Sequence, residues 1–174
     1  MADNMALFGK ITMPKMFSSD VASFHHDLYN LFGDRDNRKI CIQAPRHHAK
    51  SSIGACVFPI HHLVFDEGPK LILLCSKTLG HSIRLLDTIK NVLEYSMQFR
   101  ALFGYWGQHS AKAWTRQEII LKDGSLITTR GTGQQVIGLK HGDQRPTLVI
   151  VDDPEDMNNT RTSEAMELNL KWLL

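Results

Sequence analysis

The sequence has few cysteines, little net charge and no long hydrophobic run, and each absence excludes a class of protein. Three cysteines in 174 residues, without paired spacing, are too few for a disulfide-stabilised secreted scaffold and fit a reducing compartment. The net charge of +2 gives no global bias towards nucleic acid, although a local basic patch is compatible with it. No apolar stretch approaches the roughly 18 residues that span a bilayer, and no signal peptide is visible.

Internal repeats, low-complexity tracts and obvious linkers are also missing, which leaves one globular domain. A chain of this length buries roughly 70% of its unfolded surface. We expect an irregular N-terminal arm over residues 1–18 and the domain over residues 19–174. Cys41 and Cys75 lie on apolar, strand-like runs and Cys56 on a helical one, so three buried thiols are expected.

One segment has the layout of a phosphate-binding loop. An apolar, β-branched run over residues 39–44 predicts a strand, Pro45 marks a turn, and Lys50-Ser51 opens a helix-like run that we expect to continue to about Phe65. Backbone N–H groups at such a helix start point at an anion. Pro59 is expected to bend or end the helix. The residues expected to surround the phosphates are Ala44, Pro45, Arg46, His47, His48, Ala49, Lys50, Ser51 and Ser52.

The two positions that glycine usually occupies in such a loop carry alanine. Glycine is used there because it adopts backbone angles that other residues avoid and lets the phosphate come close. Ala44 and Ala49 are the smallest substitutes, so the phosphate interpretation stands beside a second one. In that alternative the segment is a surface loop followed by an ordinary helix-capping serine.

A second segment, residues 147–156, is an apolar run that ends in acids. A buried strand that delivers carboxylates at its C-terminal edge is what a magnesium–nucleotide site needs opposite its phosphate loop. Asp152 is expected to position Mg²⁺ together with the Ser51 hydroxyl. Asp153 or Glu155 is expected to orient the attacking water, and the pattern leaves both open. The alternative for this segment is a buried strand followed by an Asp-Pro turn.

These segments resemble the ATPase domain of large terminase subunits, the DNA-packaging motors of tailed bacteriophages. Members carry a phosphate loop close to A-P-R-G-H-A-K-S-T, and residues 44–52 follow it with His47 in the glycine position. Further matches are the strand and Ser-x-Thr of residues 71–78, a hairpin with a Gly-rich exit over residues 119–133, and the Arg-Pro entry to the acidic strand at residues 145–153. The chain departs from the family where Ile137 replaces an arginine and Asp152-Asp153 replaces Asp-Glu.

The resemblance implies an ATPase whose hydrolysis of ATP, with Mg²⁺, drives double-stranded DNA into a procapsid. The partners it implies are DNA, the portal of the procapsid, the small terminase subunit and further copies of the chain in a ring, with no membrane. The implied location is the cytoplasm of the infected bacterium, outside the mature virion. Arg46 would stabilise the developing charge, the alternative being a surface ion pair. Two other functions remain open: a nucleotide-binding fragment with little turnover, and a helicase-type translocase on the same fold.

The expected fold is α/β: a RecA-like P-loop NTPase of the ASCE type, with a mostly parallel sheet flanked by helices and a β-hairpin insertion. The domain would be truncated, without the nuclease domain of the family. We expect the active site beyond the C-terminal ends of the strands. The remaining predicted elements are helices from Ser19 to Phe32 and from Leu79 to Leu93, a strand over residues 70–75, a hairpin over residues 117–129, and a helix that starts over residues 158–162 and packs Ala165, Leu168 and Trp172 inward. By the resemblance alone, Phe24, His25 and Tyr29 are candidates to contact adenine.

Overall fold

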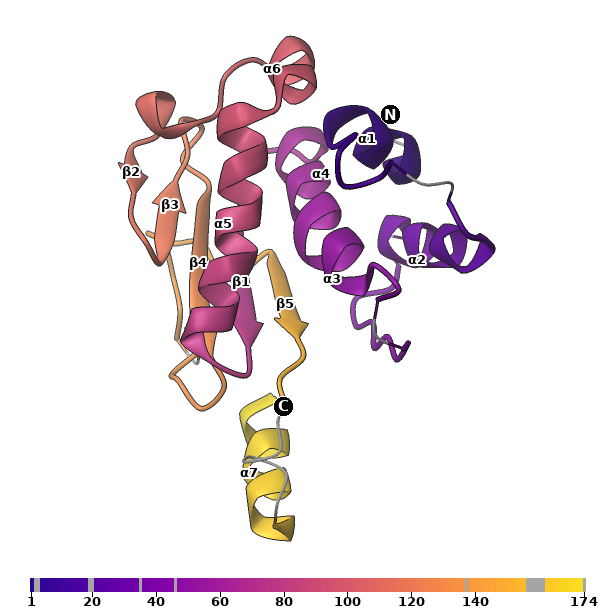
Figure 1. Ribbon diagram of the computed structural model, residues 1–174. Coiled ribbons are helices and arrows are strands. Elements are labelled where there is room, and N and C mark those ends of the chain that lie inside the picture. Colours follow the sequence, from indigo (N-terminus) through magenta and orange to yellow (C-terminus); the bar gives the residue numbers. More distant parts are fainter. Residues whose placement is uncertain are drawn as a thin grey trace. The chain divides into compact units, whose positions relative to one another are not determined.

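The computed structural model describes residues 1, 4–18, 21–34, 36–45, 47–136, 138–155 and 162–173. The chain forms two compact units: unit 1 comprises Met1–Gly68 and Thr88–Ser110, and unit 2 comprises Pro69–Asp87 and Ala111–Leu174. Helix α5 (Leu79–Tyr95) contributes its first half to unit 2 and its second half to unit 1 (Figure 1).

Unit 2 is built on a five-stranded sheet with the order β2-β3-β4-β1-β5. The central strand β1 runs parallel to both β4 and β5, and all six of its residues are buried. The first half of α5 lies across one face of this sheet (Figure 1). The continuous apolar run after Lys70 is typical of a buried parallel strand, and that prediction is confirmed. The strands are β1 (Leu71–Ser76), β2 (Ala113–Trp114), β3 (Glu118–Ile120), β4 (Leu126–Gly131) and β5 (Leu148–Asp152).

The sheet is mixed, so the expectation of a mostly parallel sheet is wrong in this respect. The pairs β2–β3 and β3–β4 are antiparallel, because the chain reverses twice before it returns to the centre of the sheet. The Asp123-Gly124 turn predicted the β3–β4 hairpin, which is confirmed, and Gly124 there has φ +93°. The coarse α/β class is therefore correct, and the ladder combines two parallel with two antiparallel pairings.

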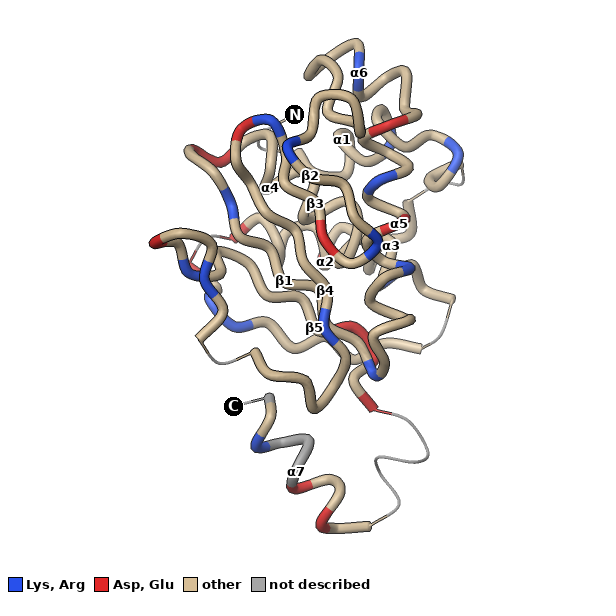
Figure 2. Tube along the Cα trace, turned by 90° about the vertical axis from the view of Figure 1, so that its left-hand side faces the viewer, with Lys and Arg blue, Asp and Glu red and all other residues tan. Residues whose placement is uncertain are grey.

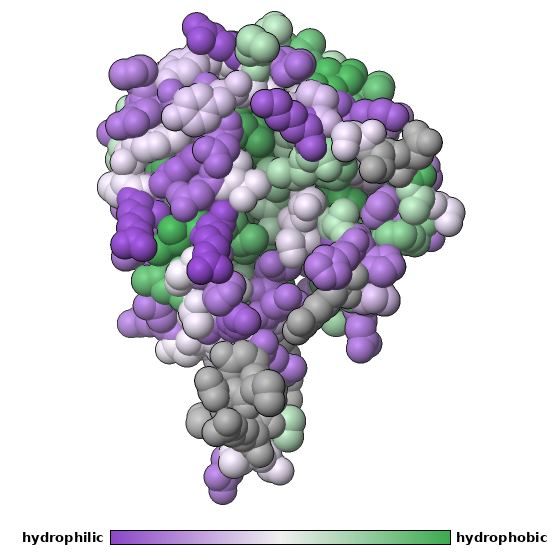
Figure 3. Space-filling view, in the orientation of Figure 1, coloured by the Kyte–Doolittle hydropathy of each residue, from purple (hydrophilic) through white to green (hydrophobic). Residues whose placement is uncertain are grey.

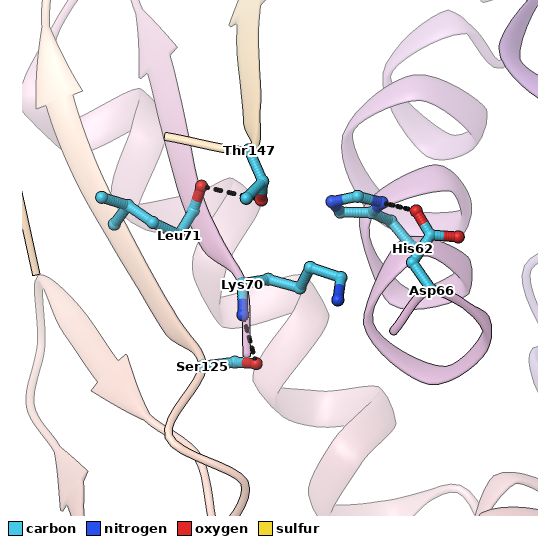
Figure 4. Close-up of polar contacts among 6 residues, drawn as sticks. All are labelled: His62, Asp66, Lys70, Leu71, Ser125 and Thr147. Atoms are coloured by element: carbon cyan, nitrogen blue, oxygen red, sulfur yellow. Dashed lines mark hydrogen bonds and ion pairs between the residues drawn. The ribbon is translucent and has the colours of Figure 1, made fainter. Parts of the chain in front are cut away.

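Polar contacts fix the register of the central strand at its start (Figure 4). The backbone N–H of Lys70 donates to the Ser125 hydroxyl oxygen at 2.9 Å, which ties β1 to the turn before β4. On the other side, the backbone N–H of Thr147 donates to the Leu71 carbonyl oxygen at 2.8 Å and its hydroxyl to the same oxygen at 3.3 Å. A one-residue slip would turn every buried side chain to the other face, so these bonds help to fix the C-terminal edge as well.

Unit 1 is helical. Its helical segments are α1 (Met5–Thr12), α2 (Ser23–Gly33), α3 (Lys50–Ser52), the π-helical stretch η1 (Ile53–Val57), α4 (Phe58–Phe65), the second half of α5, α6 (Met97–Phe103) and the short 3₁₀ turn η2 (Gln108–Ser110). Helix α2 confirms the helix predicted up to Phe32, whose predicted start at Ser19 and Asp20 lies outside the described residues. At the end of α4 the His62 ring nitrogen Nδ1 contacts the Asp66 carboxylate one turn later (Figure 4).

The N-terminal arm is not irregular, because residues 5–12 form helix α1. The Asn4 side chain accepts a hydrogen bond from the Leu7 N–H at 2.9 Å and caps the helix. The Phe8 side chain is fully buried and makes edge-to-face contacts with the aromatic rings of His61, Phe65 and Phe103. The arm prediction missed a helix whose stability comes from these distant contacts. On the opposite face α1 exposes Leu7 and Ile11, and Figure 3 shows hydrophobic side chains over this helix.

The helix predicted from Lys50 to Phe65 is present as three consecutive segments, α3, η1 and α4. Pro59 is the second residue of α4, which directly follows the π-helical stretch, so the helix changes its winding before the proline and does not end there. A π-turn is one way in which a helix accommodates such an interruption. Within η1, Gly54 lets the Phe32 ring come close, since a Cβ at this position would lie 3.1 Å from the ring.

The strand predicted over residues 39–44 does not form among the described residues, where this stretch has no regular structure. Consequently Cys41 is exposed, and the expectation that it is buried is wrong. Cys56 and Cys75 are buried as expected. Burial raises the pKa of the Cys56 thiol to about 12 and that of Cys75 to about 11, so both are protonated and unreactive at neutral pH.

Two further helices complete the fold. Before α5 the Thr78 hydroxyl accepts a hydrogen bond from the His81 N–H at 3.3 Å and caps the start of the helix. The last helix is α7 (Ser163–Leu173), whose predicted start at residues 158–161 lies outside the described residues, as does the side chain of Leu168. Trp172 donates from its indole nitrogen to the Gln134 carbonyl oxygen at 2.8 Å. Among the described residues no helix is both long enough and apolar enough to cross a membrane.

Candidate functional site

The predicted phosphate loop in unit 1 holds two residues in a conformation that glycine favours. His47 has φ +65°, and Ala49 has φ +55° with ψ +16°. His47 stands in the glycine position of the terminase-like pattern, and Ala49 precedes Lys50 where a second glycine is usual. A left-handed conformation costs a non-glycine residue roughly 1–2 kcal/mol, so the loop holds these two positions in this conformation at an energetic cost.

Lys50 is the first residue of α3, and its amine is directed back into the loop. The Lys50 Nζ contacts the Ala44 carbonyl oxygen and lies 3.3 Å from the Pro45 carbonyl oxygen. The ammonium therefore lies over the backbone of its own loop, where it neutralises the dipoles of two carbonyls. A phosphate entering the loop would exchange these neutral acceptors for a charged one, which is the stronger partner.

Helix α2 supports the loop from one side. The His25 ring Nε2 is 3.3 Å from the His48 carbonyl oxygen, while its Nδ1 accepts from the Ala22 N–H at 3.2 Å. The Phe24 ring lies 5.3 Å from the His48 ring, centroid to centroid. Two of the residues named as adenine candidates thus contact the loop, whereas Tyr29 is buried, which raises the pKa of its hydroxyl.

The carboxylates of unit 2 lie at the C-terminal edge of the parallel strands. Asp152 is the last residue of β5 and pairs in register with Ser76 at the end of β1. Ser76 also pairs with Gly131 at the end of β4, so three strand ends form one row. Parallel strands deliver their C-terminal residues to one edge, and ligands of open α/β sheets bind there. The strand predicted before the acids forms, but the expectation that it is buried is wrong, because β5 lies at the edge of the sheet and its residue Val149 is 50% exposed.

The turn after β5 is the third place where a non-glycine residue is left-handed. Asp153 has φ +44°, and within the described part of the chain His47, Ala49 and Asp153 are all the non-glycine residues with positive φ. The Lys77 N–H donates to the Asp153 carbonyl oxygen at 3.2 Å and holds this turn against the end of β1. Strained backbone of this kind concentrates at functional sites.

Sequence reasoning missed Thr132, which locks the same turn. Its hydroxyl donates to the Pro154 carbonyl oxygen at 3.0 Å, and its N–H donates to the Ser76 carbonyl oxygen at 2.9 Å. The sequence signal was the Gly-rich exit from the hairpin, Gly131-Thr132-Gly133, in which the pattern gave the threonine no role. The hydroxyl between the two glycines instead fixes the path of the acidic turn.

The structure places the other predicted site residues as follows. Ser51 and Ser52 are half-buried in α3, Asp152 is half-buried, and Asp153 and Glu155 are exposed. Arg46 lies outside the described residues, so its predicted role stays a prediction. The loop belongs to unit 1 and the acidic turn to unit 2. Each of the two predicted segments is therefore described within its own unit.

The donor set suits a hard cation that arrives with its ligand. Carboxylate and hydroxyl oxygens are the groups that Mg²⁺ prefers, and it is usually held by one or two carboxylates together with substrate phosphates and water. Among the described residues no three or more His, Cys, Asp or Glu side chains converge as a preformed metal cage. The Asp152 carboxylate and the Ser51 hydroxyl are oxygen donors of the kind that fit Mg²⁺.

Comparisons of the chain with protein-family models and with curated protein sequences found no match. The functional argument accordingly rests on the residues and on their geometry.

Proposed function

We propose that the chain is the ATP-binding and ATP-hydrolysing motor domain of a large terminase, which powers the translocation of double-stranded DNA into a procapsid. The observation that carries the proposal is the left-handed backbone of His47, Ala49 and Asp153. These strained residues fall in the two segments where the sequence pattern requires a phosphate loop and a carboxylate turn. Asp and His adopt this conformation more often than most residues do, so the support comes from Ala49 and from the occurrence of such residues in both segments.

In this proposal the residues of unit 1 bind the phosphates. The Lys50 ammonium leaves the carbonyls of Ala44 and Pro45 and binds the terminal phosphates, while the backbone N–H groups of the loop and of the start of α3 surround them. The Ser51 hydroxyl and the Asp152 carboxylate hold Mg²⁺. Arg46 stabilises negative charge on the transferred phosphoryl group.

Asp153 or Glu155 orients the attacking water. Lys77 and Thr132 donate to the carbonyl oxygens of Asp153 and Pro154 and so hold the backbone from which both carboxylates extend. When bound, Mg²⁺ neutralises charge on the phosphate oxygens and aligns them for in-line attack. Phosphoryl transfer depends on positioning and charge, so rigid backbone at both segments is the property that such a site needs.

A titration with ATP in the presence of Mg²⁺ and in excess EDTA tests the proposal. We expect binding by isothermal calorimetry that is at least roughly 10-fold tighter with Mg²⁺, because the cation joins the phosphates to Asp152 and Ser51. We expect no comparable heat when Mg²⁺ is titrated alone, since the protein supplies too few ligands. Equal affinity with and without Mg²⁺, or no binding at millimolar ATP, would contradict the proposed site.

A further inference from the structure

A polar groove in unit 2 lies outside the residues assigned to the nucleotide. It is a hollow of about 510 Å³ at the β2–β3 turn and the end of β4. Figure 2 shows basic positions at this turn and near the end of β4, with an acidic position on β3. The residues that line the groove are Thr115, Arg116, Gln117, Glu118, Arg130 and Gln134.

The two arginines carry positive charge that the protein leaves uncompensated. Within the described part of the chain the Arg116 side chain forms neither a hydrogen bond nor an ion pair, and Glu118 forms no ion pair with either arginine. Arg130 donates from Nη1 to the Thr128 hydroxyl at 3.1 Å and to the Thr129 carbonyl oxygen at 2.7 Å. These bonds fix the guanidinium and leave its other N–H groups available to an anion.

Further hydrogen bonds hold the groove in shape. The Gln134 side-chain oxygen accepts from the Gly131 N–H at 2.7 Å, which leaves the amide nitrogen as a donor. The Gln117 carbonyl oxygen accepts from the Thr129 hydroxyl at 2.9 Å and so ties the β2–β3 turn to β4. Two guanidiniums, of which that of Arg130 is held by hydrogen bonds, and an amide favour a ligand with many acceptor oxygens, and the single carboxylate of Glu118 does not outweigh them.

The lining also indicates which anion fits. The six lining residues include no aromatic side chain on which a base stacks. An open groove with arginines and amides is typical of contacts to the sugar–phosphate backbone, which carry no sequence information. We propose that this groove binds phosphate groups of a nucleic-acid backbone through Arg116 and Arg130. The inference rests on the proposed function, because it assigns the DNA contact of that function to these residues.

The test is fluorescence anisotropy of a labelled duplex of mixed sequence, measured with the full chain over a series of salt concentrations and without ATP. For the Arg116→Gln, Arg130→Gln double variant we expect at least roughly 10-fold weaker binding at low salt. The slope of log K against log salt is negative, and its magnitude should decrease by about 2, one unit for each phosphate that an arginine no longer neutralises. Arg116→Gln alone breaks no hydrogen bond or ion pair among the described residues and should account for about half of this fall. Arg145→Gln, which removes the same charge from unit 2 outside the groove, should change little.

Two further experiments identify the ligand and test the groove independently of the nucleotide site. Unlabelled duplex should displace the labelled duplex far better than inorganic phosphate at the same phosphate concentration. Equal displacement would show a site for single phosphate ions and would overturn the nucleic-acid assignment. Lys50→Ala should bind the duplex like the wild type, so the groove stands even if ATP does not bind. Unchanged affinity and slope in a folded Arg116→Gln, Arg130→Gln variant would refute the proposal.

Discussion

Alanine at position 50 is expected to weaken the binding of Mg-ATP by about 10- to 100-fold and to abolish hydrolysis in the assembled motor. The estimate follows from the loss of one charge-assisted hydrogen bond, which is worth about 1.5–3 kcal/mol. The Lys50 amine already lies inside the loop, on the carbonyls of Ala44 and Pro45, so a short movement brings it to a phosphate. Calorimetric titration with Mg-ATP measures the change.

Lys39→Ala is the matched control for this prediction. It removes the same charge from an exposed position of the same unit, eleven residues earlier, and should bind ATP like the wild type. The Lys50 amine also contacts the loop carbonyls, so its loss could disorder the loop as well as remove a phosphate contact. Lys50→Met keeps most of the side chain without the charge, and urea unfolding of each variant measures whether the fold has been destabilised. If a stably folded Lys50→Ala protein binds Mg-ATP with wild-type affinity, the loop is not a phosphate site.

Gly131→Ala is expected to destabilise the fold by about 3 kcal/mol, a large part of the stability of a typical domain. A Cβ at this position would lie 2.6 Å from the Leu79 backbone nitrogen and 3.1 Å from the Thr78 carbonyl carbon. Backbone atoms cannot rotate away as a side chain does, so β4 or the start of α5 has to shift. Urea unfolding followed by circular dichroism measures the effect.

The shift caused by Gly131→Ala should also reach the acidic turn. Gly131 precedes Thr132, whose hydroxyl and N–H bond to Pro154 and Ser76. The matched control is Gly80→Ala, at an exposed helical position where a Cβ meets only the Thr78 hydroxyl at 3.9 Å. It should stabilise the protein by up to about 1 kcal/mol, because alanine has the higher helix propensity. Wild-type stability of Gly131→Ala would mean that β4 and α5 do not meet as described.

Local patterns predicted the elements whose signals are complete within the segment. The β3–β4 hairpin follows from Asp123-Gly124 between two apolar runs, and α5 follows from apolar residues at helical spacing capped by Thr78. Both depend on neighbours only a few residues away. The strand that ends at Asp152 was predicted on the same basis, from an apolar run followed by acids, but it lies half-buried at the edge of the sheet and is not the buried strand that the run indicated.

The failures concern features that depend on distant partners. A strand forms only where it can pair with a neighbouring strand. The apolar run over residues 39–44 does not specify such a neighbour, so it predicted a strand that is not formed. Helix α1 shows the converse: a short, mixed segment becomes a helix because Phe8 packs against aromatic rings more than 50 residues away. The antiparallel side of the sheet likewise depends on which edge the hairpin joins.

The strained residues of the site belong to neither group. Alanine and histidine at glycine positions weaken the match to a phosphate loop. From the sequence alone, a surface loop followed by a helix-capping serine was therefore the alternative. The backbone of His47 and Ala49 nevertheless adopts the left-handed conformation that glycine would have provided. The sequence does not report backbone conformation at these two positions, and this is the feature that the structure adds.

The central claim is that the Lys50 loop and the Asp152 turn act on one Mg-ATP molecule, and a double-mutant cycle tests it most directly. ATP affinity is measured by calorimetry for the wild type, Lys50→Ala, Asp152→Asn and the double variant, in Mg²⁺ and in EDTA. We predict a coupling free energy of roughly 1–3 kcal/mol in Mg²⁺, and none in EDTA, where the carboxylate has no cation through which to act. Effects that add within about 0.5 kcal/mol in Mg²⁺ would mean that the two segments serve different sites, and the account would be wrong.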